Sequence, residues 1–214
     1  MTSKFTKFQI ATHIGSLIPL ALLIWDYFND HLTANPIQAV TFRTGKTALV
    51  LLVLALACTP LNTLFGFREA LKVRRALGLY AFFYVCLHFL TFIWLDYGLD
   101  LGLIFDAVAK KRYALVGFTA FLLLLPLAIT STKGWQKRLG KNWKVLHRLV
   151  YVAAPLVVVH YVWLVKADIR QPLVFGAVVL LLLLARVPLF KGAVGSWRSR
   201  WLERWRREKA EQGA

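Results

Sequence analysis

The chain has 214 residues, of which 58% are hydrophobic and 17% are charged. A water-soluble domain of this length would carry fewer apolar and more charged residues, so the composition indicates an integral membrane protein. The formal net charge of +17 would suit nucleic acid, but the basic residues lie beside apolar runs. That placement indicates that the basic residues contact anionic lipid, and we expect no nucleic-acid partner.

Apolar runs follow one another along the chain, and each is close to the ~20 residues that a helix needs to cross a bilayer. The first has no small-residue cleavage site and is expected to be retained. We find no internal repeat. The sequence predicts an all-α integral membrane bundle of about six transmembrane helices, formed by residues 8–28, 47–65, 76–95, 113–130, 149–165 and 173–189.

Basic residues are unevenly divided between the two sides of this bundle. The N-terminus, the second and fourth connections and the C-terminal tail hold 19 lysines and arginines, whereas the alternate connections hold 7. Positive charge marks the cytoplasmic side of a membrane protein, so both termini are expected in the cytoplasm. We expect a transmembrane domain over residues 1–192 and a separate cytoplasmic tail over 193–214.

The tail carries Trp197, Trp201 and Trp205 at four-residue spacing, with arginines between them. This pattern predicts a basic amphipathic helix that lies on the inner leaflet. The alternative is a solvated basic tail that makes no contact with lipid.

Histidines at membrane depth are the main candidates for a functional site, because ionisable groups there are costly to bury. His88 in the third run and His160 in the fifth lie at about the same depth, in helices that run in the same direction. Two imidazoles at one level on two helices could bind a haem iron between them. The alternative for each is a hydrogen bond between helices.

A second set of candidates lies nearer the cytoplasmic face. His147 precedes His160 by a distance of ~19.5 Å along a straight helix, which would suit a second haem level. The matching depth of the third run holds Arg74 and Arg75, and His13 lies near the same face in the first run. The sequence therefore leaves three possibilities for the group that would share a cofactor with His147: His13, an arginine, or no partner. The arginines are also explained as topology signals, or as partners of haem propionates or of a phosphate.

Several classes of self-contained enzyme lack support in the sequence. It has no GxxxxGK[ST] or GxGxxG motif, no CxxC pair and no acidic residue in the middle of a run. We therefore expect an electron-transfer subunit whose donor and acceptor are other molecules.

Short motifs in order along the chain carry a family resemblance. They are Thr44-Gly-Lys-Thr-Ala-Leu49, Thr59-Pro-Leu61, Arg74-Arg-Ala-Leu-Gly-Leu79, Leu87-His88, Thr130-Ser-Thr132, Leu139-Gly-Lys-Asn-Trp143, Leu146-His147, Val150-Tyr151, His160-Tyr161 and Trp163. The chain resembles the MsrQ family, the haem-binding membrane subunits of bacterial MsrPQ methionine-sulfoxide reductase systems. Its wider relatives are the transmembrane domains of ferric reductases and NADPH oxidases. The arginine-rich tail lies outside the match.

The resemblance implies a protein of the bacterial inner membrane that binds b-type haem, one or two groups, and FMN. It implies electron transfer from the quinone pool to MsrP, a periplasmic molybdopterin enzyme that repairs oxidised methionine. It further implies that His88 and His160 ligate an outer haem iron. His147, with Arg74 or Arg75, would serve an inner haem or another cofactor.

Two other functions stay open from the sequence. One is a ferric or flavin-linked transmembrane reductase, which would reduce iron chelates without a periplasmic partner. The other is a non-redox carrier or scaffold, which would be colourless when purified.

Overall fold

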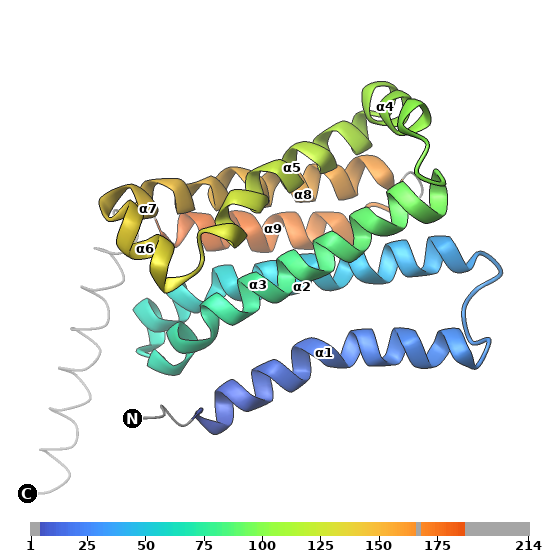
Figure 1. Ribbon diagram of the computed structural model, residues 1–214. Coiled ribbons are helices and arrows are strands. Elements are labelled where there is room, and N and C mark those ends of the chain that lie inside the picture. The colour runs from blue at the N-terminus through green and yellow to red at the C-terminus, as the bar shows by residue number, and fades with distance from the viewer. Residues whose placement is uncertain (1–4, 166–167, 187–214) are drawn as a thin grey trace, which may run out of the picture.

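The computed structural model describes residues 5–165 and 168–186, and these residues form helices and turns without a strand (Figure 1). The order along the chain is α1 (Lys7–Phe28), α2 (Pro36–Phe65), α3 (Arg68–Leu90) with a π-helical turn (Thr91–Asp96), α4 (Leu101–Lys110), α5 (Arg112–Ile129), α6 (Lys133–Leu139), α7 (Lys141–Leu146), a 3-10 turn (His147–Leu149), α8 (Val150–Leu164) and α9 (Arg170–Leu184).

Five segments are long and apolar enough to span a membrane, namely α1, α2, α3 with its π-helical turn, α5, and α7 with α8. The predicted all-α membrane bundle is confirmed. The sixth predicted span corresponds to α9, which is apolar but has only 15 described residues. The N-terminal end of α1 and the C-terminal end of α9 lie at the same end of the bundle (Figure 1), as two cytoplasmic termini require. The predicted tail over 193–214 lies outside the described residues.

The centre of the bundle is made of α2, α3, α5, α8 and α9, with α1 against α3 and α2 on the outside (Figure 1). Small buried side chains let these helices approach closely, as is usual in membrane bundles. They include Ala48, Ala55, Ala81, Ala120, Ala153 and Ala154. The antiparallel pairs α2–α3 and α5–α8 have the most extensive contacts, and the cavities described below lie between these pairs.

Helix α2 begins earlier than the predicted run at residue 47, because its first turns are polar. Asn35 caps its start by accepting a hydrogen bond from the Gln38 backbone (3.1 Å), and Pro36 occupies the first turn. Arg43 and Lys46 are thereby placed on a regular helix, where their side chains line one wall of a cavity.

Tyr84 joins α1 to the centre of the bundle. Its buried hydroxyl accepts a hydrogen bond from the Leu20 backbone (3.0 Å) and donates one to the Ser16 carbonyl (2.9 Å). These two backbone groups would otherwise bond to each other within α1. Pro19 removes a neighbouring backbone donor. A side chain inserted beside a proline is a recognised cause of a bend in a helix.

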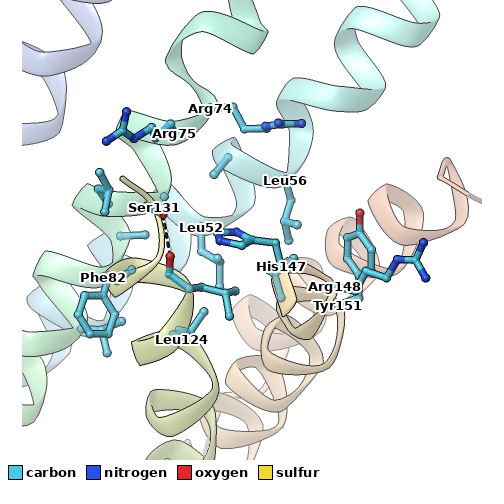
Figure 2. Close-up of a pocket in the computed structure, with 18 of the residues that line it drawn as sticks. Leu52, Leu56, Arg74, Arg75, Phe82, Leu124, Ser131, His147, Arg148 and Tyr151 are labelled. Carbon is cyan, nitrogen blue, oxygen red and sulfur yellow. Dashed lines mark hydrogen bonds between the residues drawn. The ribbon is translucent and has the colours of Figure 1, made fainter. Parts of the chain in front are cut away.

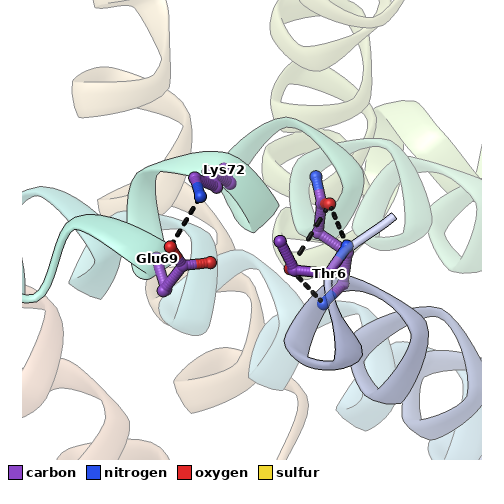
Figure 3. Close-up of polar contacts among 4 residues, drawn as sticks. Thr6, Glu69 and Lys72 are labelled. Atoms are coloured by element: carbon purple, nitrogen blue, oxygen red, sulfur yellow. Dashed lines mark hydrogen bonds and ion pairs between the residues drawn. The ribbon is translucent and has the colours of Figure 1, made fainter. Parts of the chain in front are cut away.

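Polar contacts mark the ends of α1 and α3 on the predicted cytoplasmic side (Figure 3). Thr6 and Gln9 form a reciprocal capping box at the start of α1, with hydrogen bonds of 3.3 and 2.9 Å. Glu69 and Lys72 form an ion pair of 2.6 Å on the first turn of α3. The capping box fixes the start of α1, whereas α3 begins after Phe67 without a side-chain cap.

Candidate functional site

His88 and His160 lie next to each other in the structure. His88 is in the last turn of α3 and His160 is in α8. The centroids of their rings are 6.0 Å apart and the ring planes are nearly perpendicular, at 85°. Counting along the sequence placed the two residues at one depth, and the fold also brings their rings next to each other.

Hydrogen bonds define which nitrogen of each ring is free. The Nδ1 of His88 lies 2.9 Å from the Thr41 carbonyl oxygen, and the Nδ1 of His160 lies 2.7 Å from that of Tyr113. A carbonyl oxygen only accepts, so each Nδ1 carries the hydrogen and donates. The Nε2 of each neutral ring is left with a lone pair, which is the form that binds a metal.

The separation of the rings fits one metal ion between them. A metal–imidazole bond is about 2 Å and the ring centre lies about 1 Å further, so two imidazoles on opposite sides of one ion have centroids roughly 6 Å apart. The described residues hold no group of three or more His, Cys, Asp or Glu side chains suited to a metal. Two imidazoles therefore need a ligand that supplies the other coordination positions, as a porphyrin does.

Both histidines line an outer cavity of about 800 Å³. Its walls are mainly aromatic and aliphatic, and they include Phe89, Phe92, Phe118 and Phe121. Three cationic side chains, Arg43, Lys46 and Lys111, also line it, together with one carboxylate, Asp96. An apolar cavity with cationic groups at its edge suits a flat hydrophobic ring that carries carboxylates.

The cationic groups of the outer cavity differ in their partners. Arg43 pairs with Asp26, whereas Lys46 donates to Gln171 (3.3 Å). The Lys111 ammonium donates to the Tyr97 hydroxyl (2.7 Å), and this hydrogen bond raises the pKa of Lys111. Lys111 is therefore charged at neutral pH.

His147, Arg74 and Arg75 come together in a second, inner cavity of about 560 Å³. Figure 2 shows the two arginines extending from one helix at one end of this cavity, with His147 below them. Among the described residues that line it, His147 is the only histidine. His13 lines neither cavity, and its Nδ1 lies 3.0 Å from the Tyr80 hydroxyl.

The ring of His147 is held by its neighbours on the inner side. Its Nε2 lies 3.1 Å from the Thr130 hydroxyl oxygen, which itself donates to the Pro126 carbonyl at 2.6 Å. The hydroxyl has one hydrogen, so His147 is the donor between them. Trp143 packs against the ring with centroids 4.0 Å apart. An iron bond to this Nε2 would require the hydrogen bond to Thr130 to break.

The inner cavity is strongly basic. Five cationic side chains line it, and the described lining residues include no carboxylate to neutralise them. The five are Arg74, Arg75, Lys144, Arg148 and Arg186. This charge pattern suits an anionic ligand.

Arg186 was not singled out from the sequence, since it lies inside the sixth apolar run. It donates to the Leu56 carbonyl (2.5 Å) and to the Tyr151 hydroxyl (2.8 Å). The Leu56 carbonyl lacks its usual helical donor because residue 60 is proline. The buried Nε of Arg186 has no hydrogen-bond partner among the described residues. A proline within a membrane helix and an arginine in a distant apolar run were the signals that could have suggested this pair.

Comparisons with known proteins identify the family to which the chain is similar. The family described as "Ferric reductase like transmembrane component" matches residues 44–158. A Herminiimonas arsenicoxydans protein is 49% identical over 187 residues, covering 86% of each chain. One from Rhodospirillum rubrum is 47% identical, covering 84% of this chain and 86% of its own, and one from Xanthomonas campestris pv. campestris is 46% identical, covering 84% and 85%.

These three relatives are each named "Protein-methionine-sulfoxide reductase heme-binding subunit MsrQ". No solved structure matches the chain. The facing histidines lie on α3 and α8, and the family match ends at residue 158, just before the second of them. The chain therefore belongs to the ferric-reductase-like transmembrane family and, within it, to the MsrQ haem-binding subunits.

Proposed function

We propose that this protein is an electron-transfer subunit of the bacterial inner membrane that holds haem b between His88 and His160. The observation that carries the proposal is the pair of free Nε2 atoms on rings whose centroids are 6.0 Å apart. Haem bound there supplies one-electron redox chemistry. The name of the relatives, a haem-binding subunit of a methionine-sulfoxide reductase, supports the assignment.

The protein's own residues position the ligands and exclude water. The carbonyls of Thr41 and Tyr113 hold the two imidazoles in the tautomer that binds metal. The aromatic walls of the outer cavity keep the surroundings apolar, which is one of the means by which a protein adjusts a haem potential. Lys46 and Lys111 provide positive charge for carboxylates at the cavity edge.

We propose the quinone pool as the electron donor and MsrP, in the periplasm, as the acceptor. Reduction of methionine sulfoxide to methionine consumes two electrons and two protons and releases water. A one-electron carrier must therefore deliver twice for each methionine repaired. The outer cavity lies at the end of the bundle where α2 starts, which the charge bias places on the periplasmic side.

We propose that the inner cavity binds a second cofactor through an anionic group. One imidazole and five cationic side chains favour FMN, held through its phosphate, over a second haem with two histidine ligands. The arginines would bind the phosphate oxygens through bidentate hydrogen bonds. The alternative is that His147 would ligate a second haem iron, which would require loss of the hydrogen bond to Thr130 if its Nε2 were the ligand.

The haem content of purified variants tests the proposal. His88→Ala and His160→Ala should each lose most of the Soret absorbance, because each removes one iron ligand. His31→Ala is the matched control, since His31 lies in an exposed loop beside Asp26. Retention of a full Soret band by both ligand variants would refute the haem site. A colourless wild-type protein would support the non-redox alternative, and reduction of iron chelates without a partner would support the ferric reductase.

A further inference from the structure

Each of the two facing imidazoles lies over a glycine. A Cβ atom added at Gly45 would lie 3.0 Å from the Nδ1 of His88, and one added at Gly117 would lie 2.6 Å from the Nδ1 of His160. Contacts below 3.0 Å do not occur without movement of one partner, and contacts just above it are tighter than usual. The absence of a side chain at these two positions therefore leaves room for the rings.

The glycines also explain how the rings reach their hydrogen-bond acceptors. Gly45 follows Thr41 by one helical turn, and Gly117 follows Tyr113 in the same way. A helical side chain tilts toward the N-terminus and covers the turn before its own Cα. Any side chain at residue 45 or 117 would thus lie over the carbonyl that the imidazole uses.

The two arrangements are copies of one pattern. Thr41, Gly45 and His88 correspond to Tyr113, Gly117 and His160 at a constant offset of 72 residues. The same offset relates further pairs of identical residues in the two helix pairs, namely Ala48 and Ala120, Leu52 and Leu124, Ala81 and Ala153, and Val85 and Val157. We call each set of carbonyl, glycine and imidazole a cradle.

Building on the haem site proposed above, we propose that Gly45 and Gly117 are positioning residues that fix the plane of each imidazole. In each cradle the ring is held from one side by the carbonyl and fits against the glycine, so it cannot turn freely about its bonds. The two cradles hold the ring planes at 85° to each other. Crossed imidazole planes give low-spin ferric haem a single strong low-field EPR feature, whereas parallel planes give a spectrum with three resolved g values.

The test compares alanine variants of four glycines in the full-length, haem-loaded protein. Gly117→Ala should reduce haem affinity roughly tenfold or more and move the low-field EPR feature, since overpacking displaces the ring. Gly45→Ala, with its longer contact of 3.0 Å, should show the same changes to a smaller extent. The midpoint potential of the haem that remains bound should also shift more in Gly117→Ala than in Gly45→Ala.

Two control variants separate imidazole positioning from general packing. Among the described residues, a Cβ added at Gly15 would meet no atom within 4 Å beyond its chain neighbours and the nearby backbone of its own helix, whereas one added at Gly176 would lie 3.2 Å from Val158 of α8. Gly15→Ala and Gly176→Ala should both keep the wild-type EPR spectrum, even where Gly176→Ala lowers the melting temperature.

Two results would overturn the inference while leaving the haem site in place. One is an unchanged haem affinity and EPR spectrum in Gly117→Ala. The other is a spectral shift in Gly176→Ala as large as that in Gly117→Ala. A wild-type chain that binds no haem would instead refute the proposed function together with the inference.

Discussion

Replacing Arg186 with glutamine removes one positive charge from the inner cavity and keeps an amide that can still donate to the Leu56 carbonyl. Within the described part of the chain, the buried Nε of Arg186 has no hydrogen-bond partner, while its terminal nitrogens bond to Leu56 and Tyr151. A hydrogen bond to a charged group contributes about 1.5–3 kcal/mol. Loss of one such bond to a phosphate would raise the dissociation constant of FMN by roughly 10- to 150-fold.

Riboflavin provides the matched ligand, because it has the same ring system as FMN without the phosphate. Quenching of flavin fluorescence on titration with purified protein measures both affinities. Wild-type protein should bind FMN more tightly than riboflavin, and Arg186→Gln should weaken the binding of FMN alone. Equal affinity of wild type for the two flavins, or equal weakening of both by the variant, would refute the assignment of the phosphate to this cavity.

Three further variants probe other parts of the structure. His147→Ala should lose less haem than either outer-site variant, because His147 lines the inner cavity and bonds to a hydroxyl; a loss equal to theirs, by Soret absorbance, would contradict this. Tyr84→Phe removes two hydrogen bonds to α1 and should lower the unfolding free energy by about 1–3 kcal/mol, measured by thermal unfolding in detergent. Lys111→Met should reduce the loss of folding stability at high pH. The pKa of Lys111 is raised in the folded protein by its hydrogen bond to Tyr97. This bond therefore contributes its full stabilisation below the ordinary pKa of lysine, and the contribution is lost as the pH rises through the raised pKa. An unchanged alkaline stability profile would exclude that contribution.

Depth in the membrane could be predicted from the sequence because the rise of a helix per residue is constant. That rule placed His88 and His160 at one level, and the structure brings their rings together. It could not place the ring of His147 relative to that of His160. His147 belongs to a 3-10 turn that precedes α8, so the two residues do not lie on one regular helix.

The cradles could not be recognised in the sequence for a different reason. Their matching residues share an offset of 72 but are few, and they stand among many leucines and alanines, where chance identities are frequent, so we found no internal repeat in the sequence. A backbone carbonyl is one of the three parts of each cradle, and a carbonyl is present at every residue. Only the packing of α3 on α2, and of α8 on α5, distinguishes the carbonyls of Thr41 and Tyr113 from the others.

The two cavities share part of their walls, and this has a consequence for the movement of charge. Five side chains line both, and all are aliphatic: Ala48, Leu49, Val85, Leu124 and Val157. Such a layer offers no group that can accept or release a proton. If electrons pass from the inner to the outer cavity, as the proposed function requires, they would cross toward the periplasm while their protons stay behind, and each methionine repaired would draw on the membrane potential.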